Sequence, residues 1–126
     1  MTTPDVHYLE IVTPDVEQAC AMYARLHGWS FDSPRPELGN ARVATLSNGS
    51  RVGVRAPMHA QENPVTRAYV RVADIERATK LAAEHGATIA VPPMEIAGQG
   101  TIAIYFLGGV EHGLWQCDVR PAAGGG

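Results

Sequence analysis

The chain has 126 residues, of which 45% are hydrophobic and 18% charged, and its formal net charge is −3. These values are typical of one globular domain and leave no basic surface for a nucleic acid. No apolar run approaches the roughly 20 residues that a membrane span needs, so neither a nucleic acid nor a membrane is expected as a partner.

The N-terminus and the cysteines indicate a compartment. Met1 to Asp5 lacks the basic and apolar regions of a signal peptide. Cys20 falls in a helical pattern and Cys117 at the end of a strand pattern, so free core thiols are favoured over a disulfide or a reactive pair. We therefore expect a cytoplasmic protein.

The first half predicts one strand, one helix and three more strands. Pro14 ends the first strand because it lacks an N–H, Asp15 suits a helix N-cap, and Gly28 suits a helix C-terminus. Asn48-Gly49 is a strong hairpin signal. The expected elements are a strand His7 to Val12, a helix Val16 to Leu26, and strands Trp29 to Phe31, Ala41 to Leu46 and Arg51 to Ala56.

The second half repeats this pattern. Asp15-Val16-Glu17-Gln18-Ala19 returns as Asp74-Ile75-Glu76-Arg77-Ala78, and His27-Gly28 returns as His85-Gly86. Pro57 to Pro64 is interpreted as the connector, and Pro93 to Gly100 as a loop that could act as a lid. The expected elements are a strand Arg67 to Val72, a helix Asp74 to His85, and strands Ala87 to Val91, Thr101 to Leu107 and His112 to Asp118.

Two such repeats predict an α+β fold. We expect a single domain over residues 1–126, made of two βαβββ units at about 5–57 and 66–119, with a flexible tail at 120–126. Strands with one apolar face and one helix per unit predict curved mixed sheets around a concave cavity, with the helices outside. Such a cavity is a usual ligand site.

The motifs Thr13-Pro14-Asp15-Val16-Glu17 and Leu26-His27-Gly28-Trp29, with Gly113-Leu114-Trp115-Gln116 in the second half, resemble the vicinal oxygen chelate superfamily. This superfamily includes glyoxalase I, bleomycin-resistance proteins and extradiol dioxygenases. The resemblance covers about residues 5–119. It implies the βαβββ fold but not one activity, because folds host many functions.

The resemblance also implies where a metal would bind, namely on the first and last strands of each unit. The matching positions are His7, Ala68, Gly53 and Gly113. Glycine and alanine have no side chain that binds a metal, and a catalytic zinc needs about three protein ligands. We therefore expect no metal and no other cofactor.

Without a metal, we expect the site to consist of an acid–base residue and an apolar cavity. If the odd positions of the first strand face the cavity, His7 is the candidate catalytic base, and a half-exposed strand-end histidine is the alternative. Glu10 and Arg71 are interpreted as polar strand faces or as a pair. The candidate ligand-binding residues, which suit an apolar or aromatic small molecule, are Trp29, Arg55, Met58, Tyr69, Met94, Tyr105, Trp115 and Gln116.

Three functional interpretations follow. The first is a metal-independent small-molecule-binding protein or enzyme of the glyoxalase/bleomycin-resistance type. The second is a divalent-metal-dependent lyase, isomerase or dioxygenase with ligands among His7, Glu95, Glu111 and His112. The third is an inert oligomeric scaffold. A homodimer is expected, because uncovered strand edges and apolar surface favour pairing.

Overall fold

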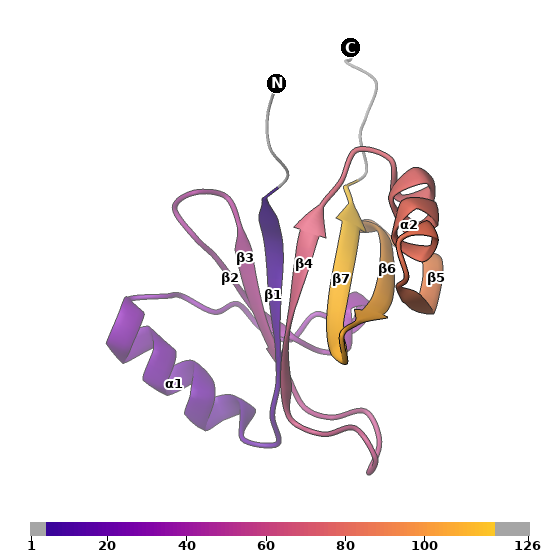
Figure 1. Ribbon diagram of the computed structural model, residues 1–126. Coiled ribbons are helices and arrows are strands. Elements are labelled where there is room, and N and C mark those ends of the chain that lie inside the picture. The colour runs from indigo at the N-terminus through magenta and orange to yellow at the C-terminus, as the bar shows by residue number, and fades with distance from the viewer. Residues whose placement is uncertain (1–4, 118–126) are drawn as a thin grey trace, which may run out of the picture. The chain divides into compact units, whose positions relative to one another are not determined.

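The computed structural model describes residues 5–117, which form two compact units divided between Val70 and Arg71 (Figure 1). The expected tail at 120–126 lies outside the described residues. None of the helices within residues 5–117 is long and apolar enough to cross a membrane.

The first unit is a mixed sheet with one long helix on one face. Its strands run in the order β2-β3-β1-β4, with β1 parallel to β3 and antiparallel to β4. The β2–β3 hairpin turns at Gly49, which has φ 91°. The elements are β1 (Val6–Val12), α1 (Val16–His27), a short 3-10 helix (Pro36–Leu38), β2 (Arg42–Thr45), β3 (Arg51–Arg55) and β4 (Val65–Arg71).

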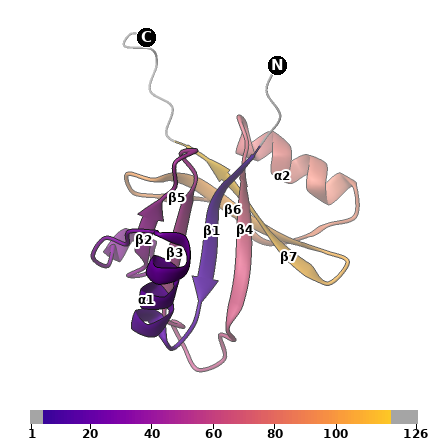
Figure 2. The same ribbon diagram turned by 90° about the vertical axis from the view of Figure 1, so that its left-hand side faces the viewer.

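The alternation of β1 decides which side chains meet the helix. Leu9 and Ile11 pack with Cys20 of α1 and with Val52 and Val54 of β3, and α1 lies beside these strands in Figure 2. The expectation that the odd positions of β1 face a cavity is therefore wrong for Leu9 and Ile11. The even positions of β1 face the other side of the sheet.

The second unit is an antiparallel sheet with its own helix. It contains α2 (Ile75–Glu84), β5 (Thr88–Ile96), β6 (Gly100–Leu107) and β7 (Val110–Gln116), with β6 between β5 and β7. Ile75 of α2 packs with Ala103 of β6 and Leu114 of β7. Both units thus pair one helix with one sheet face, and the predicted α+β class is confirmed.

Two sequence expectations are wrong in detail. Trp29 to Phe31 form no strand, and the rings of Trp29 and Phe31 pack against the core beneath α1. Most of the expected lid, Pro93 to Gly100, belongs to the β5–β6 hairpin, in which Met94 pairs with Ile102 and Ile96 with Gly100. A register irregularity between Val91 and Met94 accommodates the two prolines between them, which is a usual place for proline in a sheet.

The two helices differ in their N-caps, so they show how much a capping side chain contributes to stability. Asp74 accepts a hydrogen bond from the Arg77 N–H at 3.1 Å, whereas Asp15 makes no side-chain cap bond to α1. We expect Asp74→Ala to lower the free energy of unfolding by about 1 kcal/mol and Asp15→Ala to lower it less. Urea unfolding of both variants checks this, and equal losses would contradict the capping argument.

Candidate functional site

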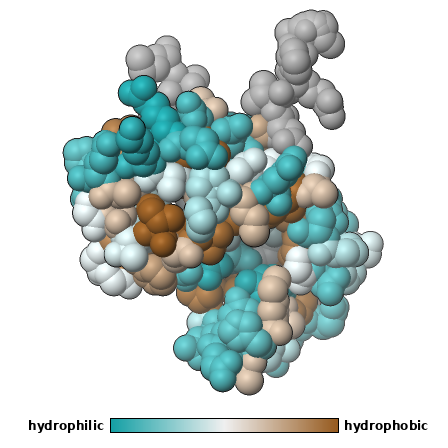
Figure 3. All heavy atoms as spheres, turned by 90° about the vertical axis from the view of Figure 1, so that its right-hand side faces the viewer, coloured by the Kyte–Doolittle hydropathy of each residue, from teal (hydrophilic) through white to brown (hydrophobic). Residues whose placement is uncertain are grey.

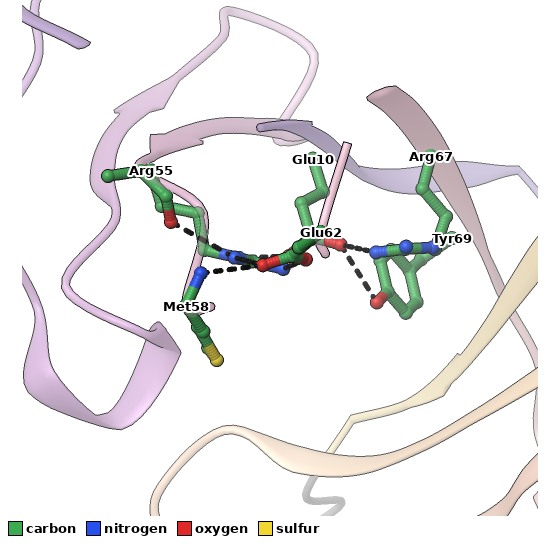
Figure 4. Close-up of polar contacts among 7 residues, drawn as sticks. Glu10, Arg55, Met58, Glu62, Arg67 and Tyr69 are labelled. Atoms are coloured by element: carbon green, nitrogen blue, oxygen red, sulfur yellow. Dashed lines mark hydrogen bonds and ion pairs between the residues drawn. The ribbon is translucent and has the colours of Figure 1, made fainter. Parts of the chain in front are cut away.

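Polar side chains converge on Glu10 (Figure 4). Because Leu9 and Ile11 pack on α1, strand alternation places Glu10 on the other face of the sheet. Glu10 lies opposite Gly53 of β3 and Arg67 of β4, and the neighbouring pair is Tyr8 and Tyr69. The register of three strands thus brings together residues that are 45 to 59 positions apart in the sequence.

Both oxygens of the Glu10 carboxylate accept hydrogen bonds. Oε2 accepts from Arg55 Nε at 2.7 Å. Oε1 accepts from Arg67 Nη1 and from the Tyr69 hydroxyl, the latter at 3.1 Å. A carboxylate held by two guanidinium groups and a phenol is fixed in position, so Glu10 orients its neighbours.

Arg55 also binds a carboxylate from the connector. Its Nη1 donates to Glu62 Oε1 at 3.0 Å and its Nη2 to Glu62 Oε2 at 2.6 Å. Glu62 Oε1 accepts a further bond from the Met58 N–H at 2.7 Å. We call Glu10, Arg55, Glu62, Arg67 and Tyr69 the Glu10 cluster.

The charges of the Glu10 cluster balance inside the protein. The side chains of its four charged residues are only 6–16% exposed, and two arginines face two glutamates. The Arg55 guanidinium lowers the pKa of Glu62 from 4.5 to about 2. Burial raises the pKa of the Tyr8 and Tyr69 hydroxyls well above the usual range, so both phenols are neutral hydrogen-bond donors at neutral pH.

Gly53 leaves room for an aromatic ring. A Cβ at this position would overlap the Tyr8 hydroxyl. The Tyr8 ring in turn meets the Tyr69 ring edge to face, with ring centroids 6.0 Å apart. The position that the resemblance assigns to a metal-binding carboxylate is therefore filled by the side chain of a buried tyrosine.

The donor set of this face does not fit a divalent ion. The carboxylate of Glu10 is already paired with two guanidinium groups, which would repel a cation. Within residues 5–117, no group of three or more His, Cys, Asp or Glu side chains could hold a metal ion.

Three of the predicted ligand-binding residues meet in this region, and a fourth does not. Arg55 and Tyr69 belong to the Glu10 cluster, and Met58 contributes its backbone N–H while its side chain is exposed. Trp29 instead follows the end of α1, where its ring lies tilted against the His27 ring with ring centroids 4.5 Å apart. There it lines an open groove of about 520 Å³ with His27, Gly28, Ser30, Thr45, Leu46, Ser47 and Asn48.

The predicted residues of the second unit divide between the two faces of its sheet. Met94 and Trp115 both lie opposite Ile102 and share its face, and Trp115 Nε1 donates to the Gln99 carbonyl at 2.9 Å. Tyr105 packs on the α2 side. Gln116 Oε1 accepts from the Ile75 N–H at 2.8 Å, which makes it a structural cap of α2.

The residues of the acid–base and metal-dependent interpretations belong to different units, His7 to the first and Glu95, Glu111 and His112 to the second. His7 is half-buried and is the extra residue of a β-bulge between β1 and β4. His112 stacks on Tyr105, with ring centroids 4.9 Å apart. Since Tyr105 is on the α2 side, His112 lies on the opposite face from Glu111 and Gly113.

Sequence reasoning did not select Glu62 and Arg67, and it interpreted Glu10 without its partners. One signal was available in the repeat. The step from Asp15 to Asp74 is 59 residues, and the same step takes Tyr8 to Arg67 and Glu10 to Tyr69. These four positions therefore alternate in the same way on two equivalent strands.

No protein-family model and no curated protein sequence matches the chain significantly. Solved structures do match it. Hypothetical protein BH1468 from Bacillus halodurans C-125 has a TM-score of 0.77 at 12% identity, over 94% of this chain and 98% of that one. Methylmalonyl-CoA epimerase from Mycobacterium tuberculosis has a TM-score of 0.73 at 14% identity, over 90% and 88%.

A third match carries a ligand. A variant of Streptomyces coelicolor methylmalonyl-CoA epimerase in complex with 2-nitronate-propionyl-CoA has a TM-score of 0.70 at 14% identity, over 94% of this chain and all of that one (100%). At identities this low, the structural similarity establishes the fold alone. Methylmalonyl-CoA epimerases belong to the vicinal oxygen chelate superfamily, so the chain has the fold of that superfamily, as its motifs indicate.

Because Glu10 is paired inside the protein and Glu17 is paired at its surface, we expect the two Glu→Gln substitutions to lower the free energy of unfolding by very different amounts. Glu10→Gln leaves two buried guanidinium groups without their shared carboxylate, so we expect a loss of about 3 kcal/mol in the free energy of unfolding. Glu17→Gln removes a 2.6 Å ion pair with Arg42 in which Glu17 is 77% exposed, and it should lose less than about 1 kcal/mol. Urea unfolding measures both, and similar losses would refute the structural role of the cluster.

Proposed function

We propose that this protein binds a small organic molecule without a bound divalent metal ion, and that the Glu10 cluster forms the polar part of its site. The observation that carries the proposal is the pairing of Glu10 with Arg55 and Arg67 on the sheet face that would have to offer metal ligands. Fixed positive groups there favour an electron-rich or anionic ligand group.

The rest of the ligand is proposed to be apolar or aromatic. Tyr8 and Tyr69 place two rings beside the charged groups on the same face, and aromatic rings favour flat or apolar molecules. Structures with this fold contain methylmalonyl-CoA or 2-nitronate-propionyl-CoA, which supports a small-molecule ligand for this chain as well.

Any proton transfer to such a ligand is assigned to His7, because the Glu10 carboxylate already accepts three hydrogen bonds. An imidazole is the commonest general base in proteins. The position of His7 at a bulge supports this assignment, since bulges re-aim side chains next to active sites.

Metal content and ligand binding test the proposal together. Elemental analysis of protein purified without a histidine tag or chelator should find less than about a tenth of a divalent ion per chain, given the lack of three suitable ligands. A panel of aromatic and acyl compounds should include one that quenches the fluorescence of Trp29 or Trp115. About one tightly bound ion per chain would instead support the metal-dependent lyase, isomerase or dioxygenase.

Any compound that binds should be titrated into a matched pair of variants. Tyr69→Phe removes one hydroxyl from the Glu10 cluster and should weaken binding about fivefold. Tyr23→Phe removes the same atom from a residue of α1, whose ring packs on the opposite face of the sheet against Val52 and Val54, and it should leave binding unchanged. Equal effects would place the ligand elsewhere.

We further propose that the protein is a cytoplasmic homodimer. Free Cys20 and Cys117 suit a reducing compartment. The β6–β7 hairpin exposes Phe106, Leu107 and Val110 by 40%, 49% and 55%, and hydrophobic side chains lie among hydrophilic ones in Figure 3. Leu107 and Val110 pair across the hairpin and share one face, so a second copy that covers them would bury apolar surface.

Light scattering at micromolar concentration should report twice the mass of one chain. Leu107→Glu should then yield monomers, because a charge at the interface core is unfavourable. Leu26→Glu, on an exposed position of α1, is the control and should remain dimeric. A monomeric unmodified protein would contradict the proposal.

A further inference from the structure

We propose that Glu62 occupies the position of a ligand carboxylate, so that the connector, residues 56–64, competes with the ligand for Arg55. This inference rests on the proposed function and names its ligand class, a small apolar or aromatic monocarboxylate. It also assigns the connector a regulatory role, because the ligand must displace Glu62 to reach Arg55.

The first support is the geometry of the Arg55–Glu62 pair. Two parallel N–H···O bonds of 3.0 and 2.6 Å join the guanidinium to both oxygens of the carboxylate. This fork geometry is the preferred way for arginine to recognise any carboxylate. A ligand carboxylate can therefore replace that of Glu62 bond for bond, while Glu10 continues to hold Arg55 through Nε.

The second support is the charge of the site. With Glu62 in place, Arg55 and Arg67 are balanced by two glutamates. When Glu62 leaves, Glu10 alone faces two guanidinium groups, and one buried positive charge is uncompensated. Because an uncompensated buried charge is strongly unfavourable, the open site selects an anion.

The third support is the exposure of the connector around Glu62. Met58 is 64% exposed, and His59, Ala60, Gln61 and Asn63 are also exposed, whereas the Glu62 side chain is mostly buried. Its bonds to Arg55 and to the Met58 N–H tie the connector to the sheet, as the dashed lines in Figure 4 show. An exposed segment with few packed side chains can open locally without unfolding the sheet.

Release occurs by competition and not by acid. The Arg55 guanidinium holds the pKa of Glu62 at about 2, so Glu62 stays ionised throughout the neutral range. Occupancy of the site is then set by the concentration and affinity of the competing carboxylate.

Calorimetric titration with benzoate tests this competition. Glu62→Gln removes the competing charge and keeps the shape of the side chain, so it should bind benzoate about tenfold more tightly than the unmodified protein. Glu62→Asp, which keeps the charge on a shorter side chain, should lie between them. Benzyl alcohol, a neutral analogue, should bind all three proteins alike.

Glu17→Gln is the matched control, since it removes an exposed glutamate from an ion pair outside the Glu10 cluster, and it should leave benzoate affinity unchanged. Hydrogen exchange supplies an independent readout in the unmodified protein. Benzoate should speed exchange of the Met58 amide, which loses its Glu62 acceptor, and this result stands even if Glu62→Gln does not fold.

Equal benzoate affinity of the unmodified protein, Glu62→Gln and Glu62→Asp would overturn the inference, as would unchanged exchange at Met58 under saturating benzoate. Either result would leave the proposed function standing, because that proposal depends on metal content and on ligands of any charge. Failure of the whole panel, with a tightly bound metal, would instead overturn the proposed function itself.

Discussion

The ion pairs of Glu10 fix the register of the first unit. Glu10 comes from β1, Arg55 from the parallel neighbour β3 and Arg67 from the antiparallel neighbour β4. A shift of one strand by one residue would move its charged side chain to the face that packs on Cys20 of α1. Because a lone charge in that apolar core is strongly unfavourable, the cluster selects one pairing of three strands.

The same interactions decide which chemistry this face can support. A divalent cation needs several oxygen or nitrogen ligands with free lone pairs, whereas here two guanidinium groups engage the Glu10 carboxylate and Tyr8 fills the space above Gly53. The shared fold therefore does not imply shared chemistry.

Local sequence signals predicted most of the secondary structure. Pro14, Gly28 and the Asn48-Gly49 turn act within a few residues, and the helices and hairpin they imply are present. The errors arose where tertiary packing overrides a local pattern. Trp29 and Phe31 are drawn into the core beneath α1, and β6 recruits the Pro-containing end of β5. The Glu10 cluster was missed because its partners are joined by strand register and not by sequence spacing.

The boundary between the two sequence repeats does not coincide with the boundary between the two compact units. This difference explains why the Glu10 cluster contains residues of both repeats. The first strand of the second repeat, β4, pairs with β1, so Arg67 and Tyr69 reach Glu10 from the other repeat. The first repeat alone contains Glu10 and Arg55 but lacks the groups that complete their hydrogen bonds. Glu62 lies on the connector that joins β3 of the first repeat to β4 of the second. It is the one member of the cluster that is not on a strand, and it can leave its partner without breaking a strand pair. Regulation through Glu62 therefore follows from how the two repeats are joined.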